Sequence, residues 1–357
     1  IALGWEIGGN SNYWLRDSEW LIPFVGNSFR PHLVIVDFRF AYHGKAWSIS
    51  HLINEISGGC PKILLDRQCG QELTPQWNRD GWVDFFDIMC VTDRTTHHPY
   101  NSKIIPWQIG VIKEVYDQIT LSANTYNSND YVLYNFRVGH SLRDLIVKKW
   151  NDSTRSPIPL MRVLSTDSME DLNKQMHHAT GGRYNISYFS EISKAPFFLV
   201  VGGYICSLPV KYYFYDTNGK FSVPFSMKVR QKLLRTFQKL FGSSELSTRY
   251  NAIIQWDSFR LWESLVSSTC PICLDFEHWG ISLPILPKSG VHYIGLTEGE
   301  AIIPSEILKS ITIKERNKIA NSGRAWFDEF YSPTAQALRL LDALRERNHL
   351  TSDGQNA

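Results

Sequence analysis

Three charged residues, Asp257, Arg260 and Glu263, stand three positions apart in a stretch with helical hydrophobic spacing. Apolar side chains fill one arc of this helix and polar side chains fill the other, which is typical of an amphipathic helix. Short apolar runs precede and follow it, so the order predicted for residues 253–276 is strand, helix, strand. Such a unit places the N–H groups of the helix start at the carboxyl edge of a parallel sheet, where an anion can bind.

A second group of polar residues follows the strand predicted at residues 85–91. Asp93, His97 and His98 fall on a loop at the same kind of sheet edge. A carboxylate or an imidazole in that position can take a proton from a hydroxyl group. An ordinary polar turn before Pro99 is the structural alternative.

The six cysteines are scattered through the chain and do not form a dense disulfide framework. Cys270 and Cys273 have the spacing of a redox or zinc pair, but no second pair of ligands follows them, and they fall in a strand-like run. We therefore expect reduced, mostly buried thiols. No Asp-x-Asp motif is present to hold a divalent cation on a diphosphate, so we expect no metal cofactor.

The composition sets the outer limits of the interpretation. The chain has 357 residues, of which 43% are hydrophobic and 20% are charged, which is enough for two domains with a core each. A formal net charge of +2 gives no reason to expect a nucleic-acid partner. No apolar run approaches the roughly 20 residues that span a bilayer, and the first residues lack a basic leader. We expect a cytoplasmic protein without a transmembrane segment, and peripheral membrane contact is left open.

Apolar strand candidates separated by helical segments predict an α/β protein whose parallel sheets are covered on both faces. We expect two facing doubly wound, Rossmann-like domains. The first is predicted at residues 1–120, a linker at 121–130 and the second at 131–330, and a C-terminal helix with its tail at 331–357 packs back towards the first domain. The cleft between two such domains is the expected ligand site.

The individual elements follow from the apolar runs and their spacing. Strands are predicted near residues 1–5, 31–38, 62–66, 85–91, 131–136, 160–164, 197–201, 271–276 and 292–296, and helices near 50–56, 143–150, 227–240 and 315–347. The nucleotide motifs Gly-x-Gly-x-x-Gly and Gly-x-x-x-x-Gly-Lys-Ser/Thr are absent, and so is the Gly-x-Ser-x-Gly nucleophile elbow. Their absence argues against a dinucleotide dehydrogenase, a P-loop NTPase and a serine hydrolase.

Several blocks together carry a family resemblance. Residues 255–265, followed by a Cys-Pro turn into a strand, resemble the donor-site block of GT-B fold glycosyltransferases. Residues 188–194, which lead to an apolar strand and then Gly-Gly, resemble the matching block of exostosin-like and bacterial family-1-type members. The segments Gly323-Arg-Ala-Trp and Tyr331-Ser-Pro resemble the closing helices of that group. The resemblance spans roughly residues 131–345.

The resemblance implies a metal-independent hexosyltransferase-like enzyme of polysaccharide biosynthesis, which moves a sugar from a nucleotide-diphosphate donor to a hydroxyl acceptor. The acceptor is a glycan, a lipid-linked compound or a small molecule. Glu263 is assigned to the donor ribose, and Gln255 stands where many retaining members have the first glutamate of an E-x7-E motif. The expected donor-binding residues are Arg137, Arg143, Lys194, Gly202, Gly203, Gln255, Asp257, Arg260 and Glu263. If the enzyme inverts, then Asp93, His97 or His98 supplies the catalytic base.

Two other functions remain open: a sugar-nucleotide epimerase on the same fold, and a non-catalytic sugar- or nucleotide-binding module. Each site residue also has a structural alternative. Arg260 and Glu263 can form an exposed helix pair. Gly202 and Gly203 can be an ordinary turn after a strand, and Arg137 can be a solvated loop arginine.

Overall fold

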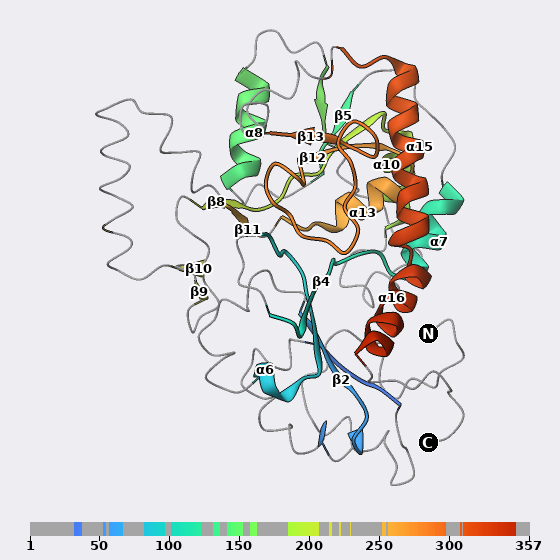
Figure 1. The fold of residues 1–357 in the computed structure, drawn as a ribbon. Coiled ribbons are helices and arrows are strands. Elements are labelled where there is room, and N and C mark those ends of the chain that lie inside the picture. The colour runs from blue at the N-terminus through green and yellow to red at the C-terminus, as the bar shows by residue number, and fades with distance from the viewer. Residues whose placement is uncertain are drawn as a thin grey trace.

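The chain is an α/β protein built on two parallel sheets of four and five strands, with seven helices in the part that the structure describes (Figure 1). The structure is a computed structural model. It describes residues 32–37, 53–54, 57–66, 82–96, 101–122, 131–135, 141–152, 158–162, 185–206, 214–215, 221–222, 229, 252–254, 256–297, 308 and 310–347. The strand predicted at 1–5 and nearly all of the helices predicted at 50–56 and 227–240 lie outside these residues.

The first sheet has the strand order β1-β2-β3-β4, and all of its strands are parallel. These strands are β1 (Val34–Asp37), β2 (Lys62–Asp66), β3 (Ile88–Val91) and β4 (Ile104–Pro106), and the short helix α6 (Trp82–Phe85) precedes β3. The first three strands confirm the prediction. The sequence did not predict β4, because Pro106 lacks an N–H group and its presence argues against a strand.

The second sheet has the order β13-β12-β7-β5-β6, again with parallel neighbours. Its strands are β5 (Val132–Leu133), β6 (Leu160–Met161), β7 (Phe197–Leu199), β12 (Cys270–Leu274) and β13 (Ile294–Leu296). From β5 the chain continues to β6 on one side of β5, and it then returns to β7 on the other side of β5. This reversal creates a topological switch point between β5 and β7, where doubly wound sheets bind ligands.

Helices cover both faces of the second sheet. Helix α8 (Ser141–Asp152) lies between β5 and β6 in the chain, α10 (Ile186–Lys194) leads into β7, and α13 (Phe259–Val266) leads into β12. Right-handed connections that run in opposite directions along a sheet place their helices on opposite faces. Figure 1 accordingly shows α8 on one side of the strands and α10 and α13 on the other.

Two more helices pack on the α13 side of the second sheet. They are α7 (Lys113–Ser122), which contacts α10 and α13, and α15 (Ile313–Phe330), which contacts α13 and β12. The apolar side chains Val115 and Ile119 of α7 belong to the core of the second sheet. Helix α7, which the predicted boundary at residue 120 places at the end of the first domain, therefore packs in the second core.

Two short antiparallel ribbons stand apart from the parallel sheets. One pairs β11 (Ala252–Ile254) with β8 (Tyr204–Cys206), and the other pairs β9 (Phe214–Tyr215) with β10 (Phe221–Ser222). The expectation that the apolar run before α13 belongs to a parallel strand–helix–strand unit is therefore wrong. The helix and the following strand β12 are present as predicted, but β11 pairs outside the parallel sheet.

The C-terminal helices connect the two sheets. A capping box at Thr312 starts α15, and Pro333 starts α16 (Pro333–Glu346), as the interruption near residue 331 predicted. Leu340 and Leu344 of α16 pack with apolar residues of the first sheet, so the chain returns to the first core. Within the described ranges, no helix is both long enough and apolar enough to span a membrane.

Candidate functional site

The loop after β7 brings backbone close to the switch point. Val200, Val201, Gly202 and Gly203 are all buried, and Gly203 has a φ of 97°. This backbone conformation favours glycine, because a Cβ atom would be strained there. The turn therefore leaves the carboxyl end of β7 without side chains at two successive positions, where another group can approach the backbone closely.

Arg143 reaches this turn from the first turn of α8. Its side chain is 9% exposed, and its Nε–H donates a hydrogen bond to the carbonyl oxygen of Val201 at 2.8 Å. Because the bond uses Nε, it fixes the plane of the guanidinium group beside the Gly202–Gly203 turn. The structure thus brings together three residues that the sequence assigned to donor binding.

Arg260 reaches the other side of the switch point from the first turn of α13. Its Nε–H donates a hydrogen bond to the carbonyl oxygen of Asn135, which follows β5. Arg143 and Arg260 are therefore each bonded to one of the two loops that flank the switch point. Two guanidinium groups at a carboxyl sheet edge create a positive potential that favours an anion.

Glu263 lies one turn further along α13 and is 4% exposed. Its carboxylate accepts a hydrogen bond from the Tyr188 hydroxyl at 3.0 Å, and Tyr188 lies in the first turn of α10. Burial, and then the negative charge of Glu263, raise the pKa of Tyr188 well above its usual value, while Arg260 lowers it. Tyr188 therefore stays protonated and acts as the donor in this bond.

The polar arc of α13 is not exposed to solvent. All residues from Leu261 to Val266 are buried, including Glu263 and Ser264. The Ser264 hydroxyl donates to the carbonyl of Leu261 at 2.7 Å, and the Ser267 hydroxyl donates to that of Ser264 at 3.0 Å. The helix itself confirms the prediction, but the alternative of an exposed Arg260–Glu263 pair does not describe this structure.

Asp93 and Asp257 meet between the two sheets. The backbone N–H of Asp257 donates to the Asp93 carboxylate at 2.5 Å. The Asp257 carboxylate in turn accepts hydrogen bonds from the N–H of Ile109 at 2.6 Å and from the indole N–H of Trp262 at 2.7 Å. Burial, and then the negative charge of Asp93, raise the pKa of Asp257 to about 8.

Further hydrogen bonds join the loop after β3 to the second sheet's side of the molecule. The Thr96 N–H donates to the carbonyl of Gly280 at 2.7 Å, and the carbonyl of Arg94 accepts from the Ser282 N–H at 2.9 Å and from the Trp256 indole at 3.2 Å. The loop after β3 thus touches the segment before α13 and the segment after β12. We call this contact between residues 92–96, 256–258 and 280–282 the junction.

Asp93 is predicted to lie on a loop at the carboxyl edge of the sheet, where it can act as a base. In the structure it is 1% exposed in the junction, with a φ of 61°. A positive φ is uncommon outside glycine and is held here by the surrounding contacts. Asp93 thus lies on the loop after β3, as predicted, but it is buried there and bonds this loop to the segment before α13. Its role as a base stays a prediction.

The structure does not place the remaining predicted site residues at the switch point or in the junction. Lys194 ends α10 just before β7, at the opposite end of that strand from Gly202, and pairs with Glu191 at 3.1 Å. A helix that precedes a parallel strand ends at the amino edge of the sheet, which explains this position. The residues His97, His98, Arg137 and Gln255 lie outside the described part of the chain.

Some contributors to the site were not predicted. The hydroxyl of Tyr188 was not assigned to Glu263, although Tyr188 belongs to the block of residues 188–194 that carries the resemblance. Gln108 and Ile109 follow β4, which was missed because of its proline. Recognition of that apolar run as an edge strand would have placed both residues at the carboxyl edge.

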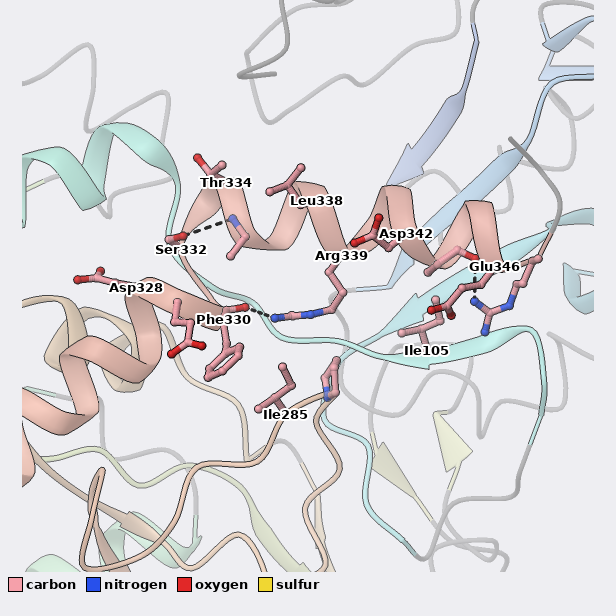
Figure 2. A pocket seen from close by; sticks show the side chains of 15 residues that line it. Ile105, Ile285, Asp328, Phe330, Ser332, Thr334, Leu338, Arg339, Asp342 and Glu346 are labelled. Carbon is pink, nitrogen blue, oxygen red and sulfur yellow. Dashed lines mark hydrogen bonds between the residues drawn. The ribbon is translucent and has the colours of Figure 1, made fainter. Parts of the chain in front are cut away.

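A groove of about 700 Å³ lies away from the switch point, between α16, the end of α15, Ile105 of β4 and the segment at Ile285. Figure 2 shows Arg339 pointing from α16 to the carbonyl of Phe330. Its guanidinium group also lies 4.5 Å from the centroid of the Tyr331 ring. The groove contains none of the residues that the sequence assigned to a site.

Comparison with known families found that no family model matches the chain and that no curated protein matches it. The residues at the switch point and the junction are therefore the observations that bear on function.

Proposed function

We propose that the chain is a metal-independent glycosyltransferase of the GT-B type, which moves a sugar from a nucleotide-diphosphate donor to a hydroxyl acceptor. The observation that carries the proposal is the position of Arg143 and Arg260. They come from two different helices, and each is bonded through Nε to one of the two loops that flank the switch point. A diphosphate beside the Gly202–Gly203 turn would lie close to both cations.

In the proposed reaction, the bond between the anomeric carbon of the sugar and the diphosphate oxygen breaks. A bond from that carbon to the acceptor oxygen forms, and the acceptor proton passes to a base. Negative charge builds up on the departing diphosphate. Arg143 and Arg260 would stabilise that charge, and their orientation by backbone carbonyls means that little reorganisation is needed when it appears.

Glu263 is assigned to the hydroxyl groups of the donor ribose. A carboxylate suits this role because it accepts hydrogen bonds from two hydroxyl groups. The hydrogen bond from Tyr188 supports the assignment, because it fixes the carboxylate on the same helix as Arg260. Ribose and diphosphate would then contact successive turns of α13.

The junction supports a cleft that closes. The segments that follow strands of both sheets meet there, since residues after β3 bond residues after β12. Closure of two domains over a donor and an acceptor excludes water, which would otherwise hydrolyse the donor. The same geometry supports the assignment of acceptor binding to the first sheet.

A panel of nucleoside diphosphates and their sugar conjugates in a thermal unfolding assay tests the proposal. A ligand at one hundred times its dissociation constant adds about 2.7 kcal/mol to the free energy of unfolding. Slow release of nucleoside diphosphate from one conjugate, with its loss in Glu263→Ala, is the result expected for a transferase. Conversion of the conjugate to an epimer would replace this proposal with the epimerase, and binding without turnover would replace it with the binding module. If no ligand raises the unfolding temperature, the proposal is wrong.

A further inference from the structure

Two buried aspartates, Asp93 and Asp257, are neighbours where the two sheets meet. Asp93 is 1% exposed and Asp257 is 7% exposed. Asp93 lies on the loop after β3 and Asp257 on the segment before α13, and the N–H of Asp257 donates to a carboxylate oxygen of Asp93 at 2.5 Å. Neighbouring negative charges in a buried setting oppose each other's ionisation, and the charge of Asp93 adds to burial in raising the pKa of Asp257.

The bonds around the pair explain how the closed arrangement is held. The Asp257 carboxylate accepts two hydrogen bonds. One comes from the N–H of Ile109, which follows β4, and the other comes from the indole N–H of Trp262 in α13. Charged or titratable side chains on the elements around the pair are Arg94, Arg260, Glu263, Tyr331 and Arg339. Segment 107–110, which supplies Ile109, has no titratable side chain.

The closed junction also buries polar atoms at a cost. The Thr92 hydroxyl oxygen and both polar atoms of the Gln108 side chain are buried and have no hydrogen-bond partner among the described residues. Both residues are 1% exposed, and they follow the adjacent strands β3 and β4. Water would satisfy these groups if the junction opened, so burial without a partner favours opening.

We propose that Asp93 and Asp257 form a proton-dependent latch between the two sheets. When the pair holds one proton, the shared negative charge is reduced and the junction stays closed. When both carboxylates ionise, their repulsion and their need for hydration open the junction, and the released proton passes to solvent. The latch does not depend on the glycosyltransferase proposal, because it uses only the bonds between the sheets.

The direction of the pH effect follows from the proton count. Burial, and then the charge of Asp93, raise the pKa of Asp257 to about 8, above the usual 3.8 of an aspartate. Between these values the closed form binds a proton that the open form releases. Closure therefore weakens by up to about ten-fold for each unit of rising pH in this window, and changes little above pH 8.

Amide hydrogen exchange on the full chain tests the latch at Thr96, Asp257 and Ser282, whose N–H groups bond across the junction. Protection factors, which correct for the intrinsic pH dependence of exchange, are compared at pH 6 and pH 8. We expect protection at these amides to fall by at least about ten-fold in the wild type. In Asp257→Asn, which resembles the protonated acid and cannot ionise, we expect a change of less than about two-fold.

Asp342→Asn is the matched control, because Asp342 is exposed on α16 and pairs with Arg345 outside the junction. It should keep the wild-type pH response. If Asp257→Asn does not fold, Asp93→Asn removes the other negative charge, and a smaller pH response than in the wild type is expected, because burial of Asp257 remains. Equal protection at pH 6 and pH 8 in the wild type would overturn the latch. So would a wild-type response in a folded variant of either aspartate.

Discussion

The Tyr188 hydroxyl donates a hydrogen bond to the Glu263 carboxylate at 3.0 Å, and this bond links α10 to α13 beside the switch point. The two residues are 75 positions apart in the chain. Their contact places a buried carboxylate in a fixed orientation on the helix that also carries Arg260. The bond therefore serves both the packing of the second core and the proposed donor site.

Tyr188→Phe removes this donor and keeps the ring. Because Glu263 is buried, we expect the free energy of unfolding to fall by about 1–3 kcal/mol, as measured by denaturant titration at pH 7. Affinity for the donor nucleotide should fall less than in Glu263→Gln, because the carboxylate remains. An unchanged free energy of unfolding would show that the hydroxyl does not stabilise Glu263. Tyr116→Phe removes a hydroxyl that donates to the partly buried Asp328 of α15. It tests whether any lost tyrosine hydroxyl has the same effect on nucleotide affinity.

Arg143→Lys keeps the positive charge but loses the Nε bond to the Val201 carbonyl. A lysine cannot hold a backbone carbonyl and present a planar fork to a phosphate at once. We expect nucleoside diphosphate affinity to fall by about ten-fold or more, which corresponds to about 1.4 kcal/mol in calorimetry. Lys113→Ala, which removes an exposed cation on α7, is the control for total charge and should bind like the wild type. An Arg143→Lys variant with wild-type affinity would contradict the assigned role.

Lys194→Ala tests a residue for which the family resemblance and the structure give different expectations. The resemblance assigns Lys194 to the donor, whereas the structure places it at the far end of β7 from Gly202. The geometry predicts an unchanged dissociation constant for the nucleotide. A loss of ten-fold or more would mean that the donor lies elsewhere than at the switch point.

Gly280→Ala tests how tightly the junction is packed. A Cβ at Gly280 would lie 2.3 Å from the Thr96 hydroxyl oxygen, and the φ of 62° is itself unfavourable for alanine. We expect a loss of about 1–3 kcal/mol in the free energy of unfolding. The double variant with Thr96→Ala should regain part of this loss, because the clash is removed while the backbone strain remains. No recovery in the double variant would show that the loss does not come from this contact.

The contribution of His292 to stability changes with pH in the opposite direction to that of Asp257. Its Nδ1 accepts the N–H of Lys288 at 2.9 Å, and its ring stacks on Trp326. Burial, and then the charge of Lys288, lower the pKa of His292 below its usual 6.5. As the pH falls below 6.5, the unfolded chain binds the proton first, so this contribution to stability is lost on acidification.

The comparison of wild type and His292→Gln isolates this contribution. Denaturant midpoints are measured at pH 7.5 and pH 5. The denaturant midpoint of the variant should lie further below that of the wild type at pH 7.5 than at pH 5. His32→Gln, at an exposed position, should show no such difference. A constant gap between His292→Gln and wild type at both pH values would refute the prediction.

Local patterns predicted much of the fold. The apolar run at 62–66 forms β2 as predicted, and Pro333 starts the last helix. Cys270 and Cys273 are buried thiols in β12, which agrees with their strand-like surroundings. In these places the hydrophobic period or a single proline decides the local structure, so neighbouring residues are sufficient.

Contacts between distant residues decided the rest. The polar arc of α13 left an exposed Arg260–Glu263 pair as an alternative, but Tyr188 from α10 and Ile109 from the segment after β4 supply hydrogen bonds to the buried carboxylates of Glu263 and Asp257. Asp93 and Asp257 are 164 positions apart, and no local pattern signals their contact. The pairing of β11 with β8 is equally non-local, since a short apolar run fits either kind of sheet.

Isothermal titration of the best nucleoside diphosphate against wild type, Arg260→Lys and Arg260→Met tests the central claim most directly. Arg260 bonds the Asn135 carbonyl beside the switch point, so both its charge and its fork geometry should matter. We predict measurable binding to the wild type, about ten-fold weaker binding to Arg260→Lys, and a further loss in Arg260→Met. Equal affinity in all three proteins, or no binding of any nucleoside diphosphate to the wild type, would contradict a donor site at the switch point.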